Sequence, residues 1–274
     1  MLVTERACAK VNLALHVLGR KPDGYHELDS TVAFAEVCDV LTVTRAPVVS
    51  LTFSGPFADV LQGSPDNTVL SAWHALAHVA GLKPAAFHLE KNLPVAAGLG
   101  GGSADAAAAL RGLVKLFNLR IAPAELNSLA LQLGADVPVC LASQTRRMQG
   151  IGEILGPASI AVPKAVVLVN PRVQSPTAKV FEALGLKPGQ AFKKPGEILK
   201  PWHNDLTAPA IKCVPEIAGV LAALESLPNI MRAGMSGSGA TCFATFDNLQ
   251  QAEAAAASIS NTHPQWWVVA TTLH

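Results

Sequence analysis

Apolar and polar residues alternate in several short stretches of the chain, and this period of two predicts strands with one buried face. In other stretches the apolar residues recur three and four positions apart, which predicts amphipathic helices. The expected strands are residues 39–44, 49–55, 86–93, 165–170, 242–246 and 266–273. The expected helices are residues 67–81, a helix after Ser103, 123–133, 175–185, 215–228 and a long one from about 249. The succession predicts a mixed α/β fold of the α+β class.

Residues at the ends of these segments agree with the assignment. Asp66 is expected to cap the helix 67–81, which Gly81 should end. Gly134 should end the helix 123–133. Proline, glycine and lysine are frequent in residues 185–201, which predicts an exposed excursion.

A chain of 274 residues can bury a large core, and two lobes are expected rather than one. The boundary is expected near residues 150–163, with an N-terminal lobe of residues 1–155 and a C-terminal lobe of residues 156–274.

The composition excludes some partners. The formal net charge is only +1, so we expect no nucleic acid and no anionic membrane as a partner. The first residues carry charges where a signal peptide has an apolar core, and no long uncharged apolar run follows. The five cysteines are odd in number and form no CxxC pair, which predicts reduced thiols in a cytoplasmic protein.

A glycine-rich segment, GLGGGS at residues 98–103, stands directly before a run of alanines. Bare backbone N–H groups at the start of a helix are suited to a phosphate. No lysine follows as in a Walker loop, and Ser103 replaces the last glycine of a dinucleotide fingerprint. A hinge or tight helix–strand packing is the alternative explanation.

A second glycine cluster occupies residues 234–242. It differs from the G-x-S-x-G nucleophile elbow because position 238 is Ser238, and this disfavours a serine hydrolase.

Two charged residues lie in apolar surroundings: Lys10 between Ala9 and Val11, and Asp136 just after a predicted helix end. Either could be a surface residue on a turn. Together with two glycine clusters they suggest phosphoryl transfer, because a carboxylate can deprotonate a hydroxyl while a lysine offsets the charge of the transferred group.

The segment PVAAGLGGGSADAAAAL resembles the second motif of the GHMP kinases. The resemblance extends in family order through ACAKVNLALHVLGRKPDGYHELDS, LGADVPVCL, GIGEIL and MSGSGATCFATF. It implies the two-lobed GHMP kinase fold, with a ribosomal-protein-like βαβ topology in the first lobe and an α+β second lobe. It also implies phosphorylation, dependent on ATP and Mg²⁺, of the 2-hydroxyl of 4-diphosphocytidyl-2-C-methyl-D-erythritol in the non-mevalonate route to isoprenoids.

The same resemblance implies roles for particular residues. Lys10 and Asp136 would be the catalytic pair, with Asp136 as the base, and Asn67 would contact adenine. The residues implied to hold the ATP phosphates are Pro94, Val95, Ala96, Ala97, Gly98, Leu99, Gly100, Gly101, Gly102, Ser103 and Ala104. The substrate-binding residues implied are Asn12, Tyr25, His26, Thr177, Phe181, Gly237 and Ser238.

Structural explanations exist for three of these residues. Tyr25 could cap the edge of a lobe, Phe181 could be a core residue, and His26 could be a structural histidine. Cys8 stands where the family commonly has proline, and the arginines at 146 and 147 stand where small or aromatic residues are common. We expect Arg146 and Arg147 to be solvated, although one could approach a substrate phosphate.

Two alternatives remain open on the sequence. One is a GHMP kinase for another small alcohol, such as homoserine or a mevalonate derivative. The other is a non-catalytic nucleotide-binding protein, which would have no need of both Lys10 and Asp136. The expected partner is a small-molecule substrate, and the expected assembly is a monomer or weak homodimer.

Overall fold

The computed structural model describes residues 1–62, 67–158, 160–193 and 200–274. These residues form two compact units, each assembled from several stretches of chain. The first unit contains Met1–Ala9, Val37–Val95 and Gly100–Ser143, and the second contains Lys10–Glu36, Ala96–Leu99 and Gln144–His274. Two long paired strands, β1 (Leu2–Arg20) and β2 (His26–Arg45), therefore supply residues to both units.

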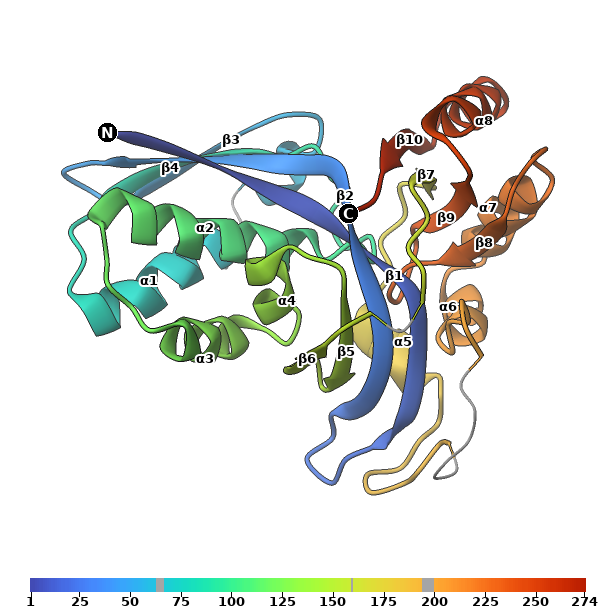
Figure 1. Cartoon of the computed structure of the whole chain (residues 1–274), viewed down its shortest axis with the longest axis horizontal. Helices are drawn as coiled ribbons and strands as arrows, with labels where there is room; N and C mark the ends of the chain where they lie inside the picture. Colours follow the sequence, from blue (N-terminus) through green and yellow to red (C-terminus); the bar gives the residue numbers. More distant parts are fainter. Residues whose placement is uncertain (63–66, 159, 194–199) are drawn as a thin grey trace. The chain divides into compact units, whose positions relative to one another are not determined.

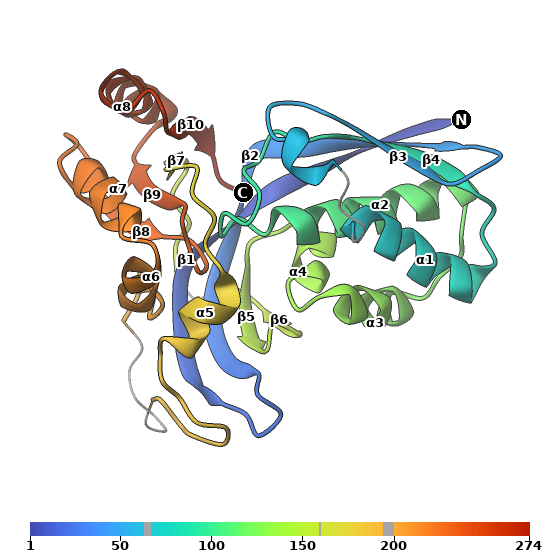
Figure 2. The same ribbon diagram turned by 180° about the vertical axis from the view of Figure 1, so that it is seen from behind.

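The first unit is a sheet with helices on one face (Figures 1 and 2). Val40–Arg45 of β2 pair antiparallel with β4 (Ala85–Glu90), and β3 (Ser50–Ser54) pairs parallel with β4. A short 3₁₀ helix, η1, covers Asp59–Leu61. The helices are α1 (Thr68–Ala80), α2 (Gly101–Phe117), α3 (Pro123–Leu133) and α4 (Val137–Ala142).

Helix α2 is the centre of the first unit. Its alanines favour a helix, and Ala104 through Leu110 are all buried. The small side chains let α1 pack closely against α2. The residues that begin α2 are therefore held on a rigid support.

The second unit contains another sheet, in the order β10–β7–β9–β8. Its strands are β7 (Ala165–Asn170), β8 (Arg232–Met235), β9 (Cys242–Phe246) and β10 (Trp267–Thr272). The helices are α5 (Thr177–Glu182), α6 (Thr207–Cys213), α7 (Glu216–Glu225) and α8 (Leu249–Thr262), of which α7 and α8 pack on this sheet. Two further strands, β5 (Arg146–Gly150) and β6 (Ile154–Gly156), pair with each other, and β5 also pairs with β2.

Every helix and strand expected from the hydrophobic pattern has a counterpart, but the long hairpin of β1 and β2 was predicted only at 39–44. In β1 the run from Ala7 to Val17 is buried without a break, so both faces of this strand are covered, although Lys10, Asn12 and His16 alternate with apolar residues. The short elements α4, α6, β5, β6 and β8 were also missed. Each compact unit contains several separate stretches of the chain, so the units do not correspond one to one to the predicted lobes, 1–155 and 156–274. The division into these lobes remains a prediction.

The N-cap of α1 is Asn67, whose side chain accepts a hydrogen bond of 2.9 Å from the Val69 N–H. The expected cap, Asp66, lies outside the described residues, as does most of the stretch 194–201 of the predicted excursion. Gly81 ends α1 in the left-handed conformation, with φ of 61°, as predicted.

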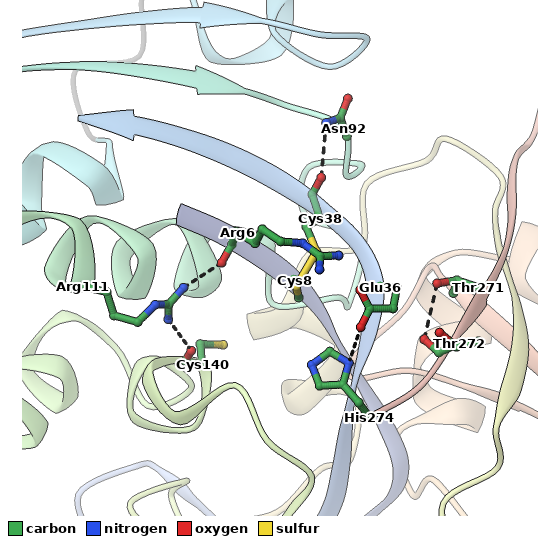
Figure 3. The surroundings of a disulfide bond; sticks show 10 residues. All are labelled: Arg6, Cys8, Glu36, Cys38, Asn92, Arg111, Cys140, Thr271, Thr272 and His274. Carbon is green, nitrogen blue, oxygen red and sulfur yellow. Dashed lines mark hydrogen bonds and ion pairs between the residues drawn. A yellow bond between two sulfur atoms is a disulfide. The ribbon is translucent and has the colours of Figure 1, made fainter. Parts of the chain in front are cut away.

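The prediction that all cysteines are reduced is wrong for one pair. Cys8 of β1 and Cys38 of β2 are joined by a disulfide, with their Cα atoms 4.0 Å apart (Figure 3). The pairing of β1 with β2 places the two residues side by side although 30 positions separate them, and the sequence pattern did not predict that pairing.

None of the helices in the described part of the chain is both long enough and apolar enough to span a membrane.

Candidate active site

Lys10 lies on β1 in the second unit and is only 4% exposed, as its apolar neighbours suggested. Its ammonium donates a hydrogen bond of 2.9 Å to Oδ1 of Asn12. The Asn12 side chain in turn donates 2.8 Å to Oγ of Ser30, which donates to the carbonyl of Ala14. The hydrogen bonds fix the Asn12 amide with its oxygen toward Lys10, so the lysine is positioned before any ligand arrives.

The two glycine clusters meet β1 in the second unit. Oγ of Ser236 donates 2.8 Å to the carbonyl of Gly98 and accepts 3.0 Å from the N–H of Asn12. The Lys10 N–H donates 2.8 Å to the carbonyl of Leu99. Ser236 therefore links all three segments. Sequence reasoning did not single it out, although it lies inside the second glycine cluster.

Gly98 is required by this packing. Its φ is +76°, and a Cβ there would lie 2.4 Å from the carbonyl oxygen of Ser236 and 2.7 Å from that of Gly239. No other residue fits so close to two backbone oxygens. The glycine at this position serves the contact between the loops.

Ser238 and Thr177, both expected to bind substrate, are brought together. Their hydroxyl groups are 2.8 Å apart, and Ser175 donates 2.6 Å to the carbonyl of Ser238. Ser238 is buried, whereas Thr177 is exposed at the start of α5. The hydroxyl of Thr177 is thus the accessible end of this pair.

Three ring-bearing residues expected at the substrate lie around the start of β2. Tyr25 is 60% exposed, on the turn between β1 and β2. The ring of His26 lies 4.6 Å from that of Phe181, which packs against the core of the second unit. Burial, with a smaller contribution from Arg20, lowers the pKa of His26, so the ring is neutral at neutral pH.

Nε2 of His26 is buried and has no hydrogen-bond partner among the described residues. A buried polar atom without a partner is costly in a folded protein. A polar group of a bound ligand could satisfy it.

In the first unit, the start of α2 presents backbone donors. Gly100 is the N-cap, with φ of 63° and no side-chain cap, and the N–H of Ala104 donates 2.8 Å to its carbonyl. The N–H groups of residues 101–103 precede that bond and have no acceptor within the helix. The left-handed backbone falls on Gly98 and Gly100, whereas Gly101 is helical.

A buried charged cluster that the sequence did not predict lies beneath this helix start. The ammonium of Lys91 is hydrogen-bonded to Oδ2 of Asp39 and, at 2.6 Å, to Oδ2 of Asp105. A Cβ on Gly101 would lie 3.3 Å from that ammonium. Asp39 and Asp105 each stand between apolar residues, as Lys10 does, and this local signal could have marked them as buried charges. Lys91 has polar neighbours on both sides, so nothing in the sequence pointed to it as their partner.

The cluster has one cation for two carboxylates, which disfavours ionisation of both. Burial raises the pKa of Asp105 to about 7, and the Asp39 charge adds to this effect while Lys91 opposes it. Burial works against the charge of Lys91, but the carboxylates of Asp105 and Asp39 outweigh it and raise its pKa. Lys91 therefore keeps a positive charge under the start of α2, where the carboxylates of Asp39 and Asp105 balance it.

Asp136 is the N-cap residue of α4 in the first unit and is partly exposed. Lys10 belongs to the second unit, so its pairing with Asp136 stays a prediction. Asn67 is 9% exposed, and its side-chain oxygen is occupied by the capping bond.

Arg146 and Arg147, which differ from the residues common in the family, both have hydrogen-bond partners in the protein. The guanidinium of Arg147 forms two hydrogen bonds to the carboxylate of Asp29, one of them 2.8 Å from Nε to Oδ1. Arg146 donates 2.6 Å to Oε1 of Gln144. The Arg147 side chain on β5 is therefore paired with Asp29 and is still 38% exposed to solvent.

Two family models match this chain. The one described as the GHMP kinases N-terminal domain matches residues 67–144, and the one described as GHMP kinases C-terminal matches residues 181–265. A 4-diphosphocytidyl-2-C-methyl-D-erythritol kinase of Bradyrhizobium sp. (strain ORS 278) is 48% identical, over 98% of this chain and 96% of that protein.

Solved structures are similar over the same length. A crystal structure of 4-(cytidine 5'-diphospho)-2C-methyl-D-erythritol kinase is 32% identical, with a TM-score of 0.79 and 99% of each chain covered. A homoserine kinase from Cytophaga hutchinsonii has a TM-score of 0.70 over 99% of this chain and 95% of that one. Since its identity is only 15%, that likeness concerns the fold alone.

Proposed function

This chain belongs to the GHMP kinase family, and from that premise we propose that it transfers the γ-phosphoryl group of ATP to 4-diphosphocytidyl-2-C-methyl-D-erythritol. The acceptor is the 2-hydroxyl, and the products are the 2-phosphate and ADP, in the non-mevalonate route to isoprenoids. The observation that carries the substrate assignment is 48% identity over 98% of the chain with a kinase of that name.

The substrate end of the site is proposed around His26. The His26 imidazole is neutral, and its buried Nε2 has no hydrogen-bond partner among the described residues. This nitrogen can donate or accept a hydrogen bond at the edge of a cytosine. The exposed Tyr25 ring offers a face for stacking. Asn12, Thr177, Phe181, Gly237 and Ser238 are proposed to bind the remainder of the substrate.

The nucleotide is proposed at the glycine-rich segment, residues 94–104, with Asn67 near the adenine. The N–H groups at the start of α2, which have no acceptor within the helix, suit phosphate oxygens, and the buried cluster of Lys91, Asp39 and Asp105 supports that helix start from beneath. ATP supplies the phosphoryl group, and Mg²⁺ is proposed as its counter-ion.

In the described part of the chain no three histidine, cysteine, aspartate or glutamate side chains are grouped around a possible metal position. Mg²⁺ in kinases usually has water and phosphate ligands with only one or two carboxylates. Mg²⁺ that arrives with ATP would therefore not need such a group of side chains.

The catalytic roles are proposed for Asp136 and Lys10. Asp136 accepts the proton of the acceptor hydroxyl as that oxygen attacks phosphorus. Lys10, which Asn12 holds in place, favours the ionised carboxylate and stabilises negative charge on the transferred group. The enzyme is proposed to work in the cytoplasm as a monomer or weak homodimer.

A coupled ADP-release assay with the purified chain tests the function. The cytidylyl substrate is compared with homoserine and mevalonate at matched concentrations, with Mg²⁺ and ATP constant. We expect turnover with the cytidylyl substrate and background rates with the other two. Preferential use of homoserine or mevalonate would overturn the substrate assignment and leave the kinase fold intact.

A further inference from the structure

The disulfide between Cys8 and Cys38 joins β1 to β2 at the point where each strand changes from one compact unit to the other. Cys8 precedes Ala9, the last residue that β1 gives to the first unit, and Cys38 follows Val37, the first residue that β2 gives to it. The bond therefore fixes the two strands against each other where both leave the first unit. Lys10 follows Cys8 by two positions.

The strand that carries Cys38 is hydrogen-bonded to the segment that leads into the glycine loop. The side-chain amide of Asn92 donates 3.2 Å to the carbonyl of Cys38 (Figure 3). Oδ1 of Asp39, the next residue, accepts hydrogen bonds of 2.6 and 2.8 Å from the N–H groups of Asn92 and Leu93. Oδ2 of Asp39 binds the Lys91 ammonium. A shift of β2 at Cys38 would move all of these contacts.

Those contacts end at the proposed phosphate position. The Lys91 ammonium lies 3.3 Å from where a Cβ of Gly101 would be, at the first residue of α2. Asp39 is completely buried, so its carboxylate can satisfy its hydrogen bonds only in this arrangement. The covalent state of Cys38 and the order of the start of α2 are thus connected through packed, hydrogen-bonded residues of one unit.

We propose that Cys8 and Cys38 form a reversible thiol–disulfide switch that changes the affinity of this kinase for ATP. The proposal rests on the kinase function proposed above. In the cytoplasm, disulfides of mesophilic proteins are mostly transient and serve catalysis or redox sensing. The disulfide holds β1 and β2 in register and keeps Asp39 and Lys91 ordered, so the oxidised enzyme binds ATP more tightly.

The chemistry is thiol–disulfide exchange with a small disulfide such as oxidised glutathione. The thiolate of one cysteine attacks a sulfur of the oxidant, which forms a mixed disulfide and releases one thiolate. The second cysteine's thiolate then attacks the protein sulfur of that mixed disulfide and releases the other. Two protein thiols lose two electrons and two protons, and one glutathione disulfide becomes two glutathione molecules. A dithiol reductant reverses both steps.

The experiment compares the whole wild-type enzyme after oxidised glutathione with the same enzyme after dithiothreitol, each freed of reagent. Cys8 and Cys38 are 6% and 8% exposed, so exchange requires local opening, and incubation continues until the thiol count is constant. Thiols are titrated in denaturant: five are expected in the reduced enzyme. In the oxidised enzyme only Cys140, Cys213 and Cys242 are expected to react. The dissociation constant for ATP is measured by calorimetry, and KM for ATP and kcat by ADP release.

We expect the dissociation constant and KM for ATP to be about five-fold higher in the reduced enzyme, with a smaller change in kcat. The double variant Cys8→Ser/Cys38→Ser should behave like reduced wild type under both conditions. The control Cys213→Ser removes an exposed thiol on α6 and should keep the full redox response.

Three results would overturn the proposal. One is a constant ATP affinity while the thiol count changes. The second is a wild-type enzyme that keeps five reactive thiols after oxidation. The third is a double variant that still responds to the oxidant. Because ATP binding is measured without the acceptor, a failed substrate assignment would be distinguished from a failed switch.

Discussion

At the scale of single residues, the charged groups of this chain are placed by neighbours that satisfy their hydrogen bonds. Asn12 accepts from the Lys10 ammonium and is itself held by Ser30 and Ser236. Buried charges are stable only with such partners. The residues that support Lys10 are therefore as necessary to its role as its own charge.

Replacement of Asp136 by asparagine should lower kcat by at least ~10²-fold, because the amide cannot accept the hydroxyl proton. ATP binding should be nearly unchanged, since the side chain keeps its size. The measurement is kcat from ADP release together with calorimetry for ATP. Asp247→Asn, a change at an exposed position after β9, is the matched control. Near-normal turnover of a folded Asp136→Asn enzyme would assign the base to another residue.

Replacement of Lys10 by alanine should depress kcat far more than it raises KM for ATP, because the ammonium acts on charge that develops during transfer. Steady-state kinetics with varied ATP give both constants. Lys21→Ala removes a solvent-exposed lysine of the same hairpin and should leave them unchanged. A rise in KM alone would make Lys10 a binding residue.

Replacement of Asp105 by asparagine should change how stability depends on pH. The pKa of Asp105 in the folded protein, about 7, lies above its ordinary value of 3.8, so the folded state binds a proton more tightly than the unfolded state. The stabilising contribution is complete below about pH 4 and is lost as the pH rises through 7. Denaturant unfolding at several pH values should show this loss for wild type and not for Asp105→Asn. Parallel profiles would show that Asp105 does not titrate in this range.

At the scale of elements, glycine has different tasks in the two halves of the loop before α2. Gly98 permits contact with the second glycine cluster in the second unit, whereas Gly100 caps α2 in the first unit. Both have positive φ. The loop is thus defined by backbone conformation, and a substitution there acts first through strain.

Gly98→Ala should destabilise the protein by more than about 2 kcal/mol, because alanine disfavours the left-handed backbone and its Cβ would strike two carbonyl oxygens. Gly219→Ala is the control. Gly219 lies inside α7 with nothing within 4 Å of the added Cβ, so this change should stabilise by about 0.4–1 kcal/mol. Both are read from denaturant unfolding. Equal stability of Gly98→Ala and wild type would mean that the loops can separate at little cost.

At the scale of the whole molecule, the units are not successive pieces of the chain. Leu15 and Val17 of β1 belong to the hydrophobic core that contains β7 and α7. The backbone of Leu15 also exchanges hydrogen bonds of 2.9 Å with His203 and Asp205. The second unit therefore needs the N-terminal hairpin to complete its core.

A fragment of residues 144–274 should not fold alone, because it lacks the hairpin residues that cover its core. Fusion of residues 10–36 through a flexible linker should increase its helical circular dichroism and its solubility. The measurements are circular dichroism and size-exclusion chromatography. A cooperative unfolding transition of the fragment without residues 10–36 would contradict this assignment of the core.

The sequence by itself determined the local structure and the family. Strand β7, the capped helix α1 and the glycine-rich start of α2 follow from preferences that act within a few residues, and the family motifs are contiguous in the chain. Lys10 was recognised because its apolar neighbours lie beside it in sequence. Each of these features is encoded where it occurs.

Only the tertiary structure decided which distant residues meet. Asp39 and Lys91 are 52 positions apart, and Asn12 and Ser236 are 224 apart. The pairing of Cys8 with Cys38 depends on the register of the β1–β2 hairpin, which brings together residues 30 positions apart. Contacts of this kind depend on how whole elements pack and on the burial of charge, and no stretch of a few residues contains that information.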